Sequence, residues 1–464
     1  MNKSKLAFVR YATFVGQKTR AILTLNLLIM FKYLFFSMLV LVLTGCVTAN
    51  STFTRVPPGI WRGVLELEKF QMAVNDKDTV ILLTDQFKPG ELPFNFEVKY
   101  VDDERFYVEF HNGSERIRCD SIRYGRDRMQ ARDTMNIYFP EYASYIHAEI
   151  RSGVMKGEWV VTTRDNYRVP FYAHAGRDYR FTALNEPPAG QLSGEWATLF
   201  GIEKPEPEKA IGEFQQQGNH LEGTFRTETG DYRYLEGTVQ GRKFWLSCFD
   251  GAHAFLFSGS MRGDSLQGEF RSGTHSRTLW TGWRDPNFQL GNADSLTRLK
   301  TNAGNITFSV KNPQGTAVTF PGASFDGKIK IFTIMGTWCP NCRDEQQFLT
   351  KYLQNNPAVA KNLAIMGLSF ERGKDTARIN AILAEYKKQM GIPFEIVYAG
   401  GASTAEAERV FPVLNQVTAF PTMIILDKND RIRRIHTGFD GPATSKHGAF
   451  KKEFEDLIRT LNDE

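Results

Sequence analysis

The sequence predicts a multidomain chain in which an all-β N-terminal region precedes a C-terminal α/β domain. From Gly59 to about Leu290, short runs alternate apolar with polar residues and are separated by turn residues, which is typical of a sandwich or barrel. After Ser295, apolar strand runs alternate with helical runs, which indicates an α/β domain. The length of 464 residues is enough for two or three domains with separate cores.

The composition is that of an ordinary globular protein, with 42% hydrophobic and 23% charged residues. The formal net charge of +5 is concentrated at the N-terminus, because residues 1–45 contain six lysines and arginines and no acid. The rest of the chain therefore carries a net charge of −1. A protein without a basic surplus is not expected to bind nucleic acid.

Residues 1–45 are predicted to be a signal peptide. The stretch "MFKYLFFSMLVLVLTGC", from Met30 to Cys46, has a lysine followed by an apolar run of signal-peptide length. It ends in Leu-Thr-Gly-Cys, which resembles a bacterial lipobox, so Cys46 is the predicted lipidation site. Because Met30 begins a complete signal peptide by itself, a start at Met30 is an alternative. A plain transmembrane anchor that starts near Ala21 is another.

Each of these alternatives exports the rest of the chain. We therefore expect a protein of the cell envelope that faces the periplasm and is lipid-anchored to a bacterial membrane. Residues 46–58 are polar and contain prolines, so they are predicted to tether the lipid to the first domain. An oxidising compartment makes a close cysteine pair a disulfide candidate.

The all-β region is predicted to hold two similar units, at residues 59–184 and 191–290, joined by "NEPPAG". Related Gly-Trp motifs open the two segments, and related Gly-Glu-aromatic motifs close them. The closing glycines, Gly157 and Gly268, are 111 residues apart. This spacing favours an internal repeat of about one small β-unit.

No catalytic or metal-binding pattern stands out in the all-β region. Its six histidines are scattered without metal-ligand spacing, so no metal and no cofactor is predicted. Cys119 and Cys248 are solitary in the sequence. The sequence leaves open whether they pair with each other or stay as buried free thiols.

The α/β domain is predicted at residues 300–464. Its expected order is a hairpin, a strand, a helix, a strand, a helix, a second hairpin and a last helix. The corresponding residues are 305–320 for the first hairpin, 328–336, 339–355, 363–370 and 377–390 for the next four elements, 422–437 for the second hairpin and 447–461 for the last helix.

The motif "GTWCPNC" places Cys339 and Cys342 directly after a buried strand, at the start of a helix. Unpaired N–H groups and the helix dipole stabilise a thiolate at that position, so Cys339 is the predicted nucleophile and Cys342 the resolving cysteine. Pro340 suits the first helical turn. A zinc site would need a second Cys or His pair, a copper-chaperone site a different spacing, and a peroxiredoxin site a threonine where Gly336 stands. The pattern therefore favours dithiol redox chemistry.

Together with "AFPT" about eighty residues later, this motif resembles the thioredoxin superfamily, and within it the TlpA/ResA-type exported thiol–disulfide oxidoreductases. The resemblance covers about residues 305–461. It implies a thioredoxin fold, a redox-active disulfide between Cys339 and Cys342, and a cis peptide bond before Pro421. It also implies that Trp338, Phe420 and Pro421 contact the substrate.

Two positions depart from the relatives. Thr333 stands where classical thioredoxin has a buried aspartate, so another group must manage the proton of the resolving cysteine. The pattern Cys-x-x-Cys-x-x-Glu makes Glu345 the catalytic candidate, with a solvated surface charge as the alternative. Gln347 replaces the proline that many relatives have after this glutamate. Glu371 is a weaker second candidate.

The predicted function is therefore an exported, lipid-anchored thiol–disulfide oxidoreductase of the protein-disulfide reductase type. The resemblance implies that its partners are disulfide-containing envelope proteins and a membrane protein that donates electrons. The alternative is a binding lipoprotein of the envelope, in which the β-rich region acts and the redox domain is accessory.

Overall fold

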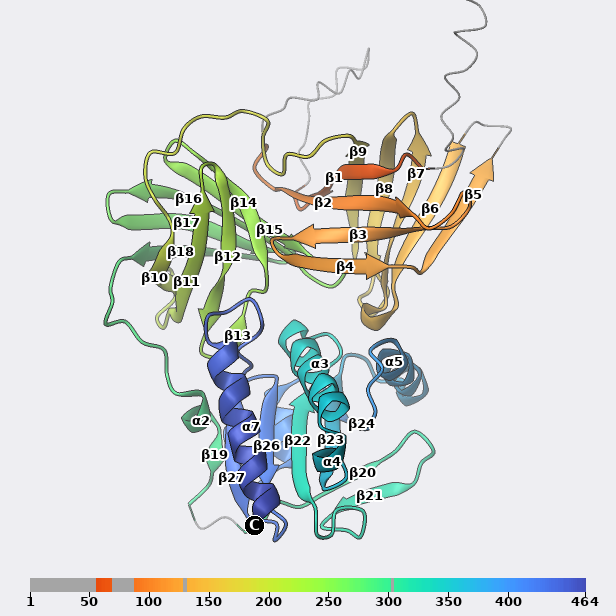
Figure 1. Cartoon of the computed structure of the whole chain (residues 1–464), viewed down its shortest axis with the longest axis vertical. Helices are drawn as coiled ribbons and strands as arrows, with labels where there is room; N and C mark the ends of the chain where they lie inside the picture. The colour runs from red at the N-terminus through yellow and green to blue at the C-terminus, as the bar shows by residue number, and fades with distance from the viewer. Residues whose placement is uncertain (1–55, 69–86, 128–131, 302–303) are drawn as a thin grey trace, which may run out of the picture. The chain divides into compact units, whose positions relative to one another are not determined.

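The computed structural model describes residues 56–68, 87–127, 132–301 and 304–464, and Val56–Glu464 form one compact unit (Figure 1). The predicted signal peptide, Cys46 and most of the predicted tether lie outside the described residues. Among the helices that are described, none combines the length and the apolar composition needed to cross a membrane.

The first part of the all-β region is an open antiparallel sheet of nine strands. Its order is β4-β3-β2-β1-β9-β8-β7-β6-β5, so the chain runs as a meander and β9 returns to pair with β1. Strands β4 and β5 are its two edges. The strands are β1 Gly59–Glu66, β2 Glu91–Tyr100, β3 Phe106–Asn112, β4 Glu115–Cys119, β5 Ile122–Asp127, β6 Arg132–Phe139, β7 Ser144–Arg151, β8 Val154–Val161 and β9 Arg168–Ala175.

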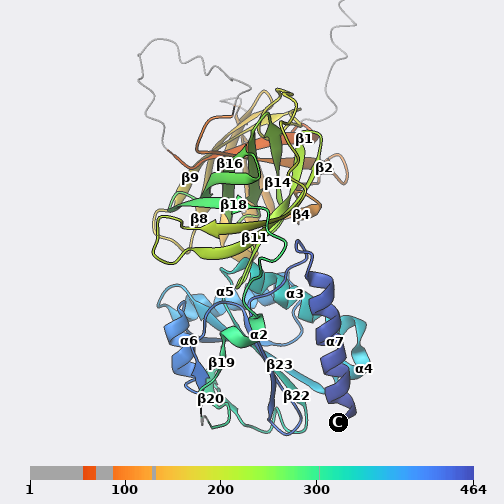
Figure 2. The same ribbon diagram turned by 90° about the vertical axis from the view of Figure 1, so that its left-hand side faces the viewer.

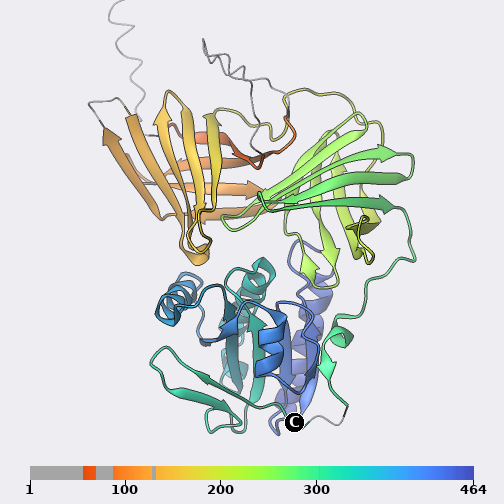
Figure 3. The ribbon, with the colours of Figure 1, turned by 180° about the vertical axis from the view of Figure 1, so that it is seen from behind.

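The second part is a closed barrel, drawn in green in Figure 3. Its strands also run as a meander, the last strand β18 pairs with the first strand β10, and pairing of β11 with β12 completes the ring. The short strand β13 pairs with β12 alone. The strands are β10 Gly194–Phe200, β11 Glu208–Gln217, β12 His220–Thr227, β13 Gly230–Asp231, β14 Leu235–Gln240, β15 Lys243–Phe249, β16 Ala254–Arg262, β17 Ser265–Ser272 and β18 Ser276–Trp283.

The two sheets share details at the positions of the repeated motifs. Trp61 in β1 and Trp196 in β10 are both buried, and each donates its indole N–H to the carbonyl four residues earlier, at 2.9 and 2.8 Å. Gly157 and Gly268 both lie in the strand before the last. A Cβ at either glycine would lie about 2 Å from a backbone oxygen of the neighbouring strand (1.9 and 2.1 Å), so a side chain does not fit there. The main difference is closure: the second sheet closes and the first does not.

Residues 308–464 form a thioredoxin fold, as the resemblance implied. The five-stranded sheet has the order β24-β23-β22-β26-β27, with β22, β23 and β24 parallel and the other pairings antiparallel. Its strands are β22 Ile329–Met335, β23 Leu363–Glu371, β24 Glu395–Gly401, β26 Thr422–Leu426 and β27 Ile432–Thr437. The hairpin β20 Phe308–Lys311 and β21 Ala317–Phe320 precedes it.

Helices cover both faces of this sheet, and α6 and α7 lie on opposite sides of it in Figure 2. One core joins α3, α5 and α7 to the face of β22 that carries Ile331, and the other joins α6 and the β20–β21 hairpin to the face that carries Phe332. The helices are α3 Pro340–Asn355, α4 Pro357–Ala360, α5 Thr376–Gln389, α6 Thr404–Val410 and α7 His447–Asp463. Four shorter elements are η1 Pro140–Tyr142, α2 Ala293–Leu296 and the paired strands β19 Arg298–Leu299 and β25 Leu414–Asn415.

The predicted elements of this domain are confirmed, whereas β24 and α6 were not predicted. Strand β24 lies at the edge of the sheet and ends in two glycines, and α6 has only seven residues, so neither has a strong sequence pattern. Cys119 and Cys248 are both buried free thiols, which settles the question that the sequence left open.

Candidate redox site

Cys339 lies between β22 and α3, at the N-cap of the helix. Its Sγ accepts a hydrogen bond from the backbone N–H of Cys342 at 3.2 Å. The two cysteines differ in exposure, since 5% of Cys339 is exposed and Cys342 is fully buried. Both are free thiols. Cys339 is therefore the more exposed residue of the pair, at a position where the first helical turn stabilises a negative charge.

Cys342 sits in surroundings that oppose its ionisation. Burial raises the pKa of the Cys342 thiol well above its usual range, and the hydrogen bond with Cys339 and the nearby charges of Cys339 and Glu345 raise it further. A buried thiol of this kind ionises only when a nearby group takes its proton. The arrangement suits a resolving cysteine.

Glu345 is fully buried one turn after Cys342, so it is not a solvated surface charge. Burial raises the pKa of its carboxyl well above the usual value. Its Oε2 accepts a hydrogen bond from the side-chain amide of Gln346 at 3.3 Å, and its Oε1 has no partner among the described residues. The same amide of Gln346 donates to the hydroxyl of Thr333 at 3.1 Å. Thr333 therefore takes part in the network around Glu345, although it cannot itself titrate.

Glu371, the second candidate, is held differently. Its carboxylate accepts hydrogen bonds from the backbone N–H and hydroxyl of Thr337, at 2.7 and 2.9 Å, and from the hydroxyl of Ser369 at 2.6 Å. Burial raises its pKa, while these bonds lower it. Glu371 thus ties the end of β23 to the loop before Cys339, and this geometry favours a positioning role.

The predicted substrate-contact residues surround Cys339. The Phe420–Pro421 peptide bond is cis, as the resemblance implied, and a second cis bond at Phe320–Pro321 was not predicted. The carbonyl of Phe420 accepts a hydrogen bond from Cys339 Sγ at 3.5 Å, and its ring meets that of Trp338 edge to face at 5.5 Å. The indole N–H of Trp338 donates to Phe370 at 2.8 Å.

Residues of the all-β region contact the start of α3, which sequence reasoning missed. Asn341, between the two cysteines, donates to the carbonyl of Asp231 at 3.3 Å. Arg343 lies over the ring of Tyr142, 5.6 Å from its centroid. Asp344 pairs with Arg233 at 2.5 Å. Three of the first five residues of this helix are thus engaged by the β-rich region.

Arg233 is the centre of a buried ion-pair network. Its guanidinium pairs with Asp344 of α3, with Asp250 of the barrel at 3.4 Å and with Glu115 of the open sheet. Only 1% of the Arg233 side chain is exposed. The network joins the open sheet, the barrel and helix α3 of the thioredoxin fold. The partners are scattered along the sequence, so no local pattern could have predicted it.

A cavity of about 350 Å³ lies beside Cys339. One wall comes from the thioredoxin fold and includes Trp338 and Phe420, and the other comes from the all-β region and includes Arg164 and Asp231. The β-rich region therefore forms part of the surroundings of the reactive sulfur. This placement is a property of the folded chain that its sequence did not indicate.

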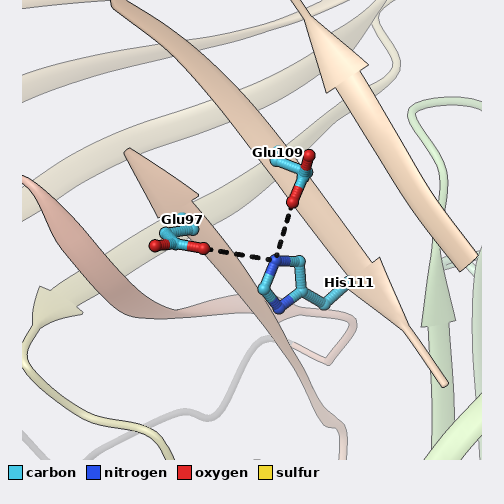
Figure 4. A group of neighbouring side chains, drawn as sticks. All are labelled: Glu97, Glu109 and His111. Atoms are coloured by element: carbon cyan, nitrogen blue, oxygen red, sulfur yellow. Dashed lines mark ion pairs between the residues drawn. The ribbon is translucent and has the colours of Figure 1, made fainter. Parts of the chain in front are cut away.

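A second cluster of chemically active side chains lies on the open sheet (Figure 4). His111 Nε2 is 3.5 Å from Glu109 and 3.9 Å from Glu97. Such a trio has the donor set of a metal site, which the scattered histidines of the sequence did not suggest. However, the ammonium group of Lys99 pairs with both carboxylates, at 2.6 and 3.1 Å. A lysine already supplies the positive charge, so the geometry fits an ion-pair cluster better than a metal centre.

No protein-family model and no curated protein sequence matches the chain. Among solved structures, the C-terminal part resembles thioredoxin-like thiol–disulfide oxidoreductases. A protein described as a disulfide isomerase from Bacteroides thetaiotaomicron is 17% identical, covers 37% of this chain and 93% of its own, and has a TM-score of 0.27.

Two further structures are similar to the same part of the chain. A thiol:disulfide interchange protein of the thioredoxin family from Chlorobium tepidum is 19% identical over 35% of this chain and 98% of its own, with a TM-score of 0.26. A secreted thiol–disulfide isomerase from Corynebacterium glutamicum is 19% identical over 38% and 99%, with a TM-score of 0.27. Because these identities and scores are low, the function proposed below rests on the geometry of the cysteine pair instead.

Proposed function

We propose that the chain is a thiol–disulfide oxidoreductase that acts through Cys339 and Cys342. The observation that carries the proposal is the Cys339 sulfur at the N-cap of α3, bonded to the N–H of Cys342, with the buried carboxyl of Glu345 one turn behind. A nucleophilic sulfur at a helix N-terminus with a second thiol in reach is the arrangement that disulfide exchange requires.

The proposed reaction has two steps. The thiolate of Cys339 attacks one sulfur of a substrate disulfide, so a mixed disulfide forms and the other substrate sulfur leaves as a thiolate. Cys342 then attacks the sulfur of Cys339, which releases the second substrate thiolate and leaves a Cys339–Cys342 disulfide. Two electrons pass to the substrate, and an external dithiol must reduce the pair for the next cycle.

Glu345 is the proposed proton acceptor for Cys342 in the second step. Its Oε1 has no partner among the described residues, and the charge of Glu345 is one of the causes that raise the pKa of the Cys342 thiol. Burial opposes charge on both groups, so when Glu345 is ionised, moving the Cys342 proton to it exchanges one buried charge for another. This exchange avoids a second charge in a dry site.

In the cell we propose reduction of disulfides in the envelope, with electrons from a membrane protein, as the resemblance implies. Lipidation at Cys46 would hold the chain at the membrane. Replacing Cys46 with serine should abolish metabolic labelling with palmitate and leave the precursor uncleaved. Labelling that persists in this variant would contradict the lipid anchor and favour a transmembrane anchor.

The exchange reaction is tested with the full mature chain. We expect the reduced protein to reduce a small disulfide with dithiothreitol as electron source, and a Cys342→Ala variant to accumulate mixed disulfides with its substrates. A Cys339→Ser variant serves as the control, because it lacks the attacking sulfur. Exchange that proceeds equally well without Cys339 would overturn the proposal.

A binding protein is the second candidate, and one observation favours it: the β-rich region supplies much of the wall of the cavity beside Cys339. A double variant, Cys339→Ser with Cys342→Ser, separates the two functions. If this variant supports growth as well as the natural protein under conditions that require the gene, the binding function is the essential one.

A further inference from the structure

We propose that the cavity beside Cys339 selects small disulfides that carry carboxylate groups. This inference rests on the exchange reaction proposed above and narrows its substrate. It differs from the expectation of protein substrates, because that expectation came from the family resemblance alone.

Access to Cys339 is narrow. Only 5% of Cys339 is exposed, and the cavity that it lines has a volume of about 350 Å³, at the lower end of the range of small-molecule sites. The neighbouring Asn341 is held by its hydrogen bond to Asp231, so the β-rich region stays close to the cysteine pair. A small disulfide fits this space, whereas the surface of a folded protein does not.

The cavity wall carries two arginines. Arg164 and Arg372 both line the cavity, and neither forms an ion pair in the part of the chain that the structure describes. Arg372 lies over the ring of Trp338, 4.9 Å from its centroid, and Trp338 directly precedes Cys339. Arg164 lies over the ring of Tyr167 at 5.0 Å and contacts His275 at 3.3 Å. Two arginines thus line the same cavity as Cys339.

The positive charges of Arg164 and Arg372 repel each other. After burial, the charge of Arg164 is the next cause that lowers the pKa of Arg372, and both arginines lower the pKa of His275. Two like charges held close together are stabilised strongly by a counterion that pairs with both of them. Arg164 is also kept in place, because Arg378 of α5 donates to the carbonyl of Thr162 in the same loop at 2.9 Å.

Two acids line the cavity as well, and both are weakened as negative charges. Burial raises the pKa of Asp231 to about 7, and its oxygens already accept hydrogen bonds from the backbone N–H groups of Arg233 and Gly441. Burial also raises the pKa of Glu208. The other histidine of the wall, His253, is paired with Asp250. Arg164 and Arg372 are therefore the two cations of the wall for which the described residues form no ion pair.

The reaction is the exchange already described, with the substrate named by class. The thiolate of Cys339 attacks a disulfide R–S–S–R in which each R carries a carboxylate, and R–S⁻ leaves. Attack by Cys342 then releases the second R–S⁻, and the two protons that the cysteines lose go to the two product thiolates. The carboxylate on R would pair with Arg164 and Arg372, which brings the disulfide to Cys339.

Charge selection is tested with two small disulfides of similar length. One is 3,3′-dithiodipropionate, which carries two carboxylates, and the other is cystamine, which carries two amines. The rate of oxidation of the fully reduced protein is followed by stopped-flow tryptophan fluorescence, and each rate is divided by that of free dithiothreitol with the same disulfide. We expect the protein to favour the dianion by about tenfold or more at low salt, and this preference to fall with salt.

Arg164→Gln with Arg372→Gln is the test variant, and Arg262→Gln is the matched control, since Arg262 is exposed at the end of β16. In the double variant the rate with the dianion should fall about tenfold and the rate with cystamine should rise. The control should keep the ratio of the natural protein. Circular dichroism and the melting temperature verify that each variant is folded.

Each outcome bears on one claim. An unchanged ratio in the double variant overturns the role of the arginines and leaves the exchange reaction intact. Reduction of insulin as fast as of the small dianion overturns selection of small disulfides. If the reduced protein exchanges with neither small disulfide nor with insulin, the proposed function itself fails.

Discussion

The two sides of helix α3 differ in whether their charged groups have ion-pair partners. On the side that faces the all-β region, Asp344 pairs with Arg233 and Arg343 lies 4.0 Å from Glu141, although Asn341 Oδ1 and Arg343 Nε have no hydrogen-bond partner in the described residues. On the side that faces the thioredoxin core, Glu345 and Gln346 are buried, yet each has a side-chain oxygen without a partner in the described residues.

This difference indicates which groups hold the helix and which are available for chemistry. A buried polar group without a partner destabilises a fold by about 1–3 kcal/mol, so such groups usually have a reason to remain. Paired groups fix the position of the cysteines, and an unpaired carboxyl next to Cys342 can take up or release a proton. The predictions below test this division, from the largest expected effect to the smallest.

Loss of the attacking sulfur should have the largest effect. A Cys339→Ser variant should exchange disulfides no faster than solution thiols do, because Cys342 is fully buried. Limited iodoacetamide should modify Cys339 first in the reduced natural protein, as mass spectrometry of peptides can show. Equal modification of both cysteines would contradict the assigned roles.

Breaking the paired side should mainly destabilise the fold. An Arg233→Met variant leaves Asp344, Asp250 and Glu115 without their shared cation, and removal of one partner from a buried pair typically destabilises by about 3–5 kcal/mol. Chemical denaturation followed by fluorescence measures this change. Arg262→Met is the control, for which an exposed site predicts a change within about 0.5 kcal/mol. A similar small change for both variants would show that the Arg233 network does not hold the helix.

Removing the proton acceptor on the unpaired side should slow exchange. A Glu345→Gln variant keeps the shape of the side chain and should reduce the rate of the resolving step by about 100-fold, the lower end for general acid–base groups. Quenched-flow mass spectrometry can follow the decay of the mixed disulfide. The comparison variant is Glu371→Gln. It should slow this step less, because the carboxylate of Glu371 already accepts hydrogen bonds from Thr337 and Ser369. If Glu345→Gln and Glu371→Gln slowed the resolving step equally, Glu345 would not be the specific acceptor of the Cys342 proton.

The local patterns of the sequence predicted much of this site. Alternating apolar and helical runs predicted β22 and α3, and the spacing of Cys339 and Cys342 predicted the redox pair. The burial of Glu345 could also have been inferred, since it lies three residues after Cys342 and four before Leu349, on one helix face. A solvated charge is the alternative for this position, because glutamate is rarely buried.

What the sequence could not predict depends on contacts between distant segments. Closure of the second sheet requires β11 to pair with β12 while β18 pairs with β10, and alternation within each strand is the same for an open and a closed sheet. Arg233 and Arg164 lie more than a hundred residues before the cysteine pair, yet Arg233 pairs with Asp344 and Arg164 lines the cavity beside Cys339. Such contacts have no local signature.

The last and smallest expected effect is on stability, and its size depends on pH. Burial raises the pKa of Glu345 above its usual value of 4.5, so the folded protein keeps a proton that the unfolded chain loses as pH rises above about 4.5. Stability therefore decreases with rising pH in the natural protein through this residue. Glutamine at this position is always neutral, so Glu345→Gln should match the natural protein near pH 4 and exceed its melting temperature increasingly toward pH 8. Thermal unfolding of both reduced proteins across this range measures the difference. A constant difference would mean that Glu345 ionises as freely in the folded protein as in the unfolded chain, so burial would not raise the pKa of its carboxyl.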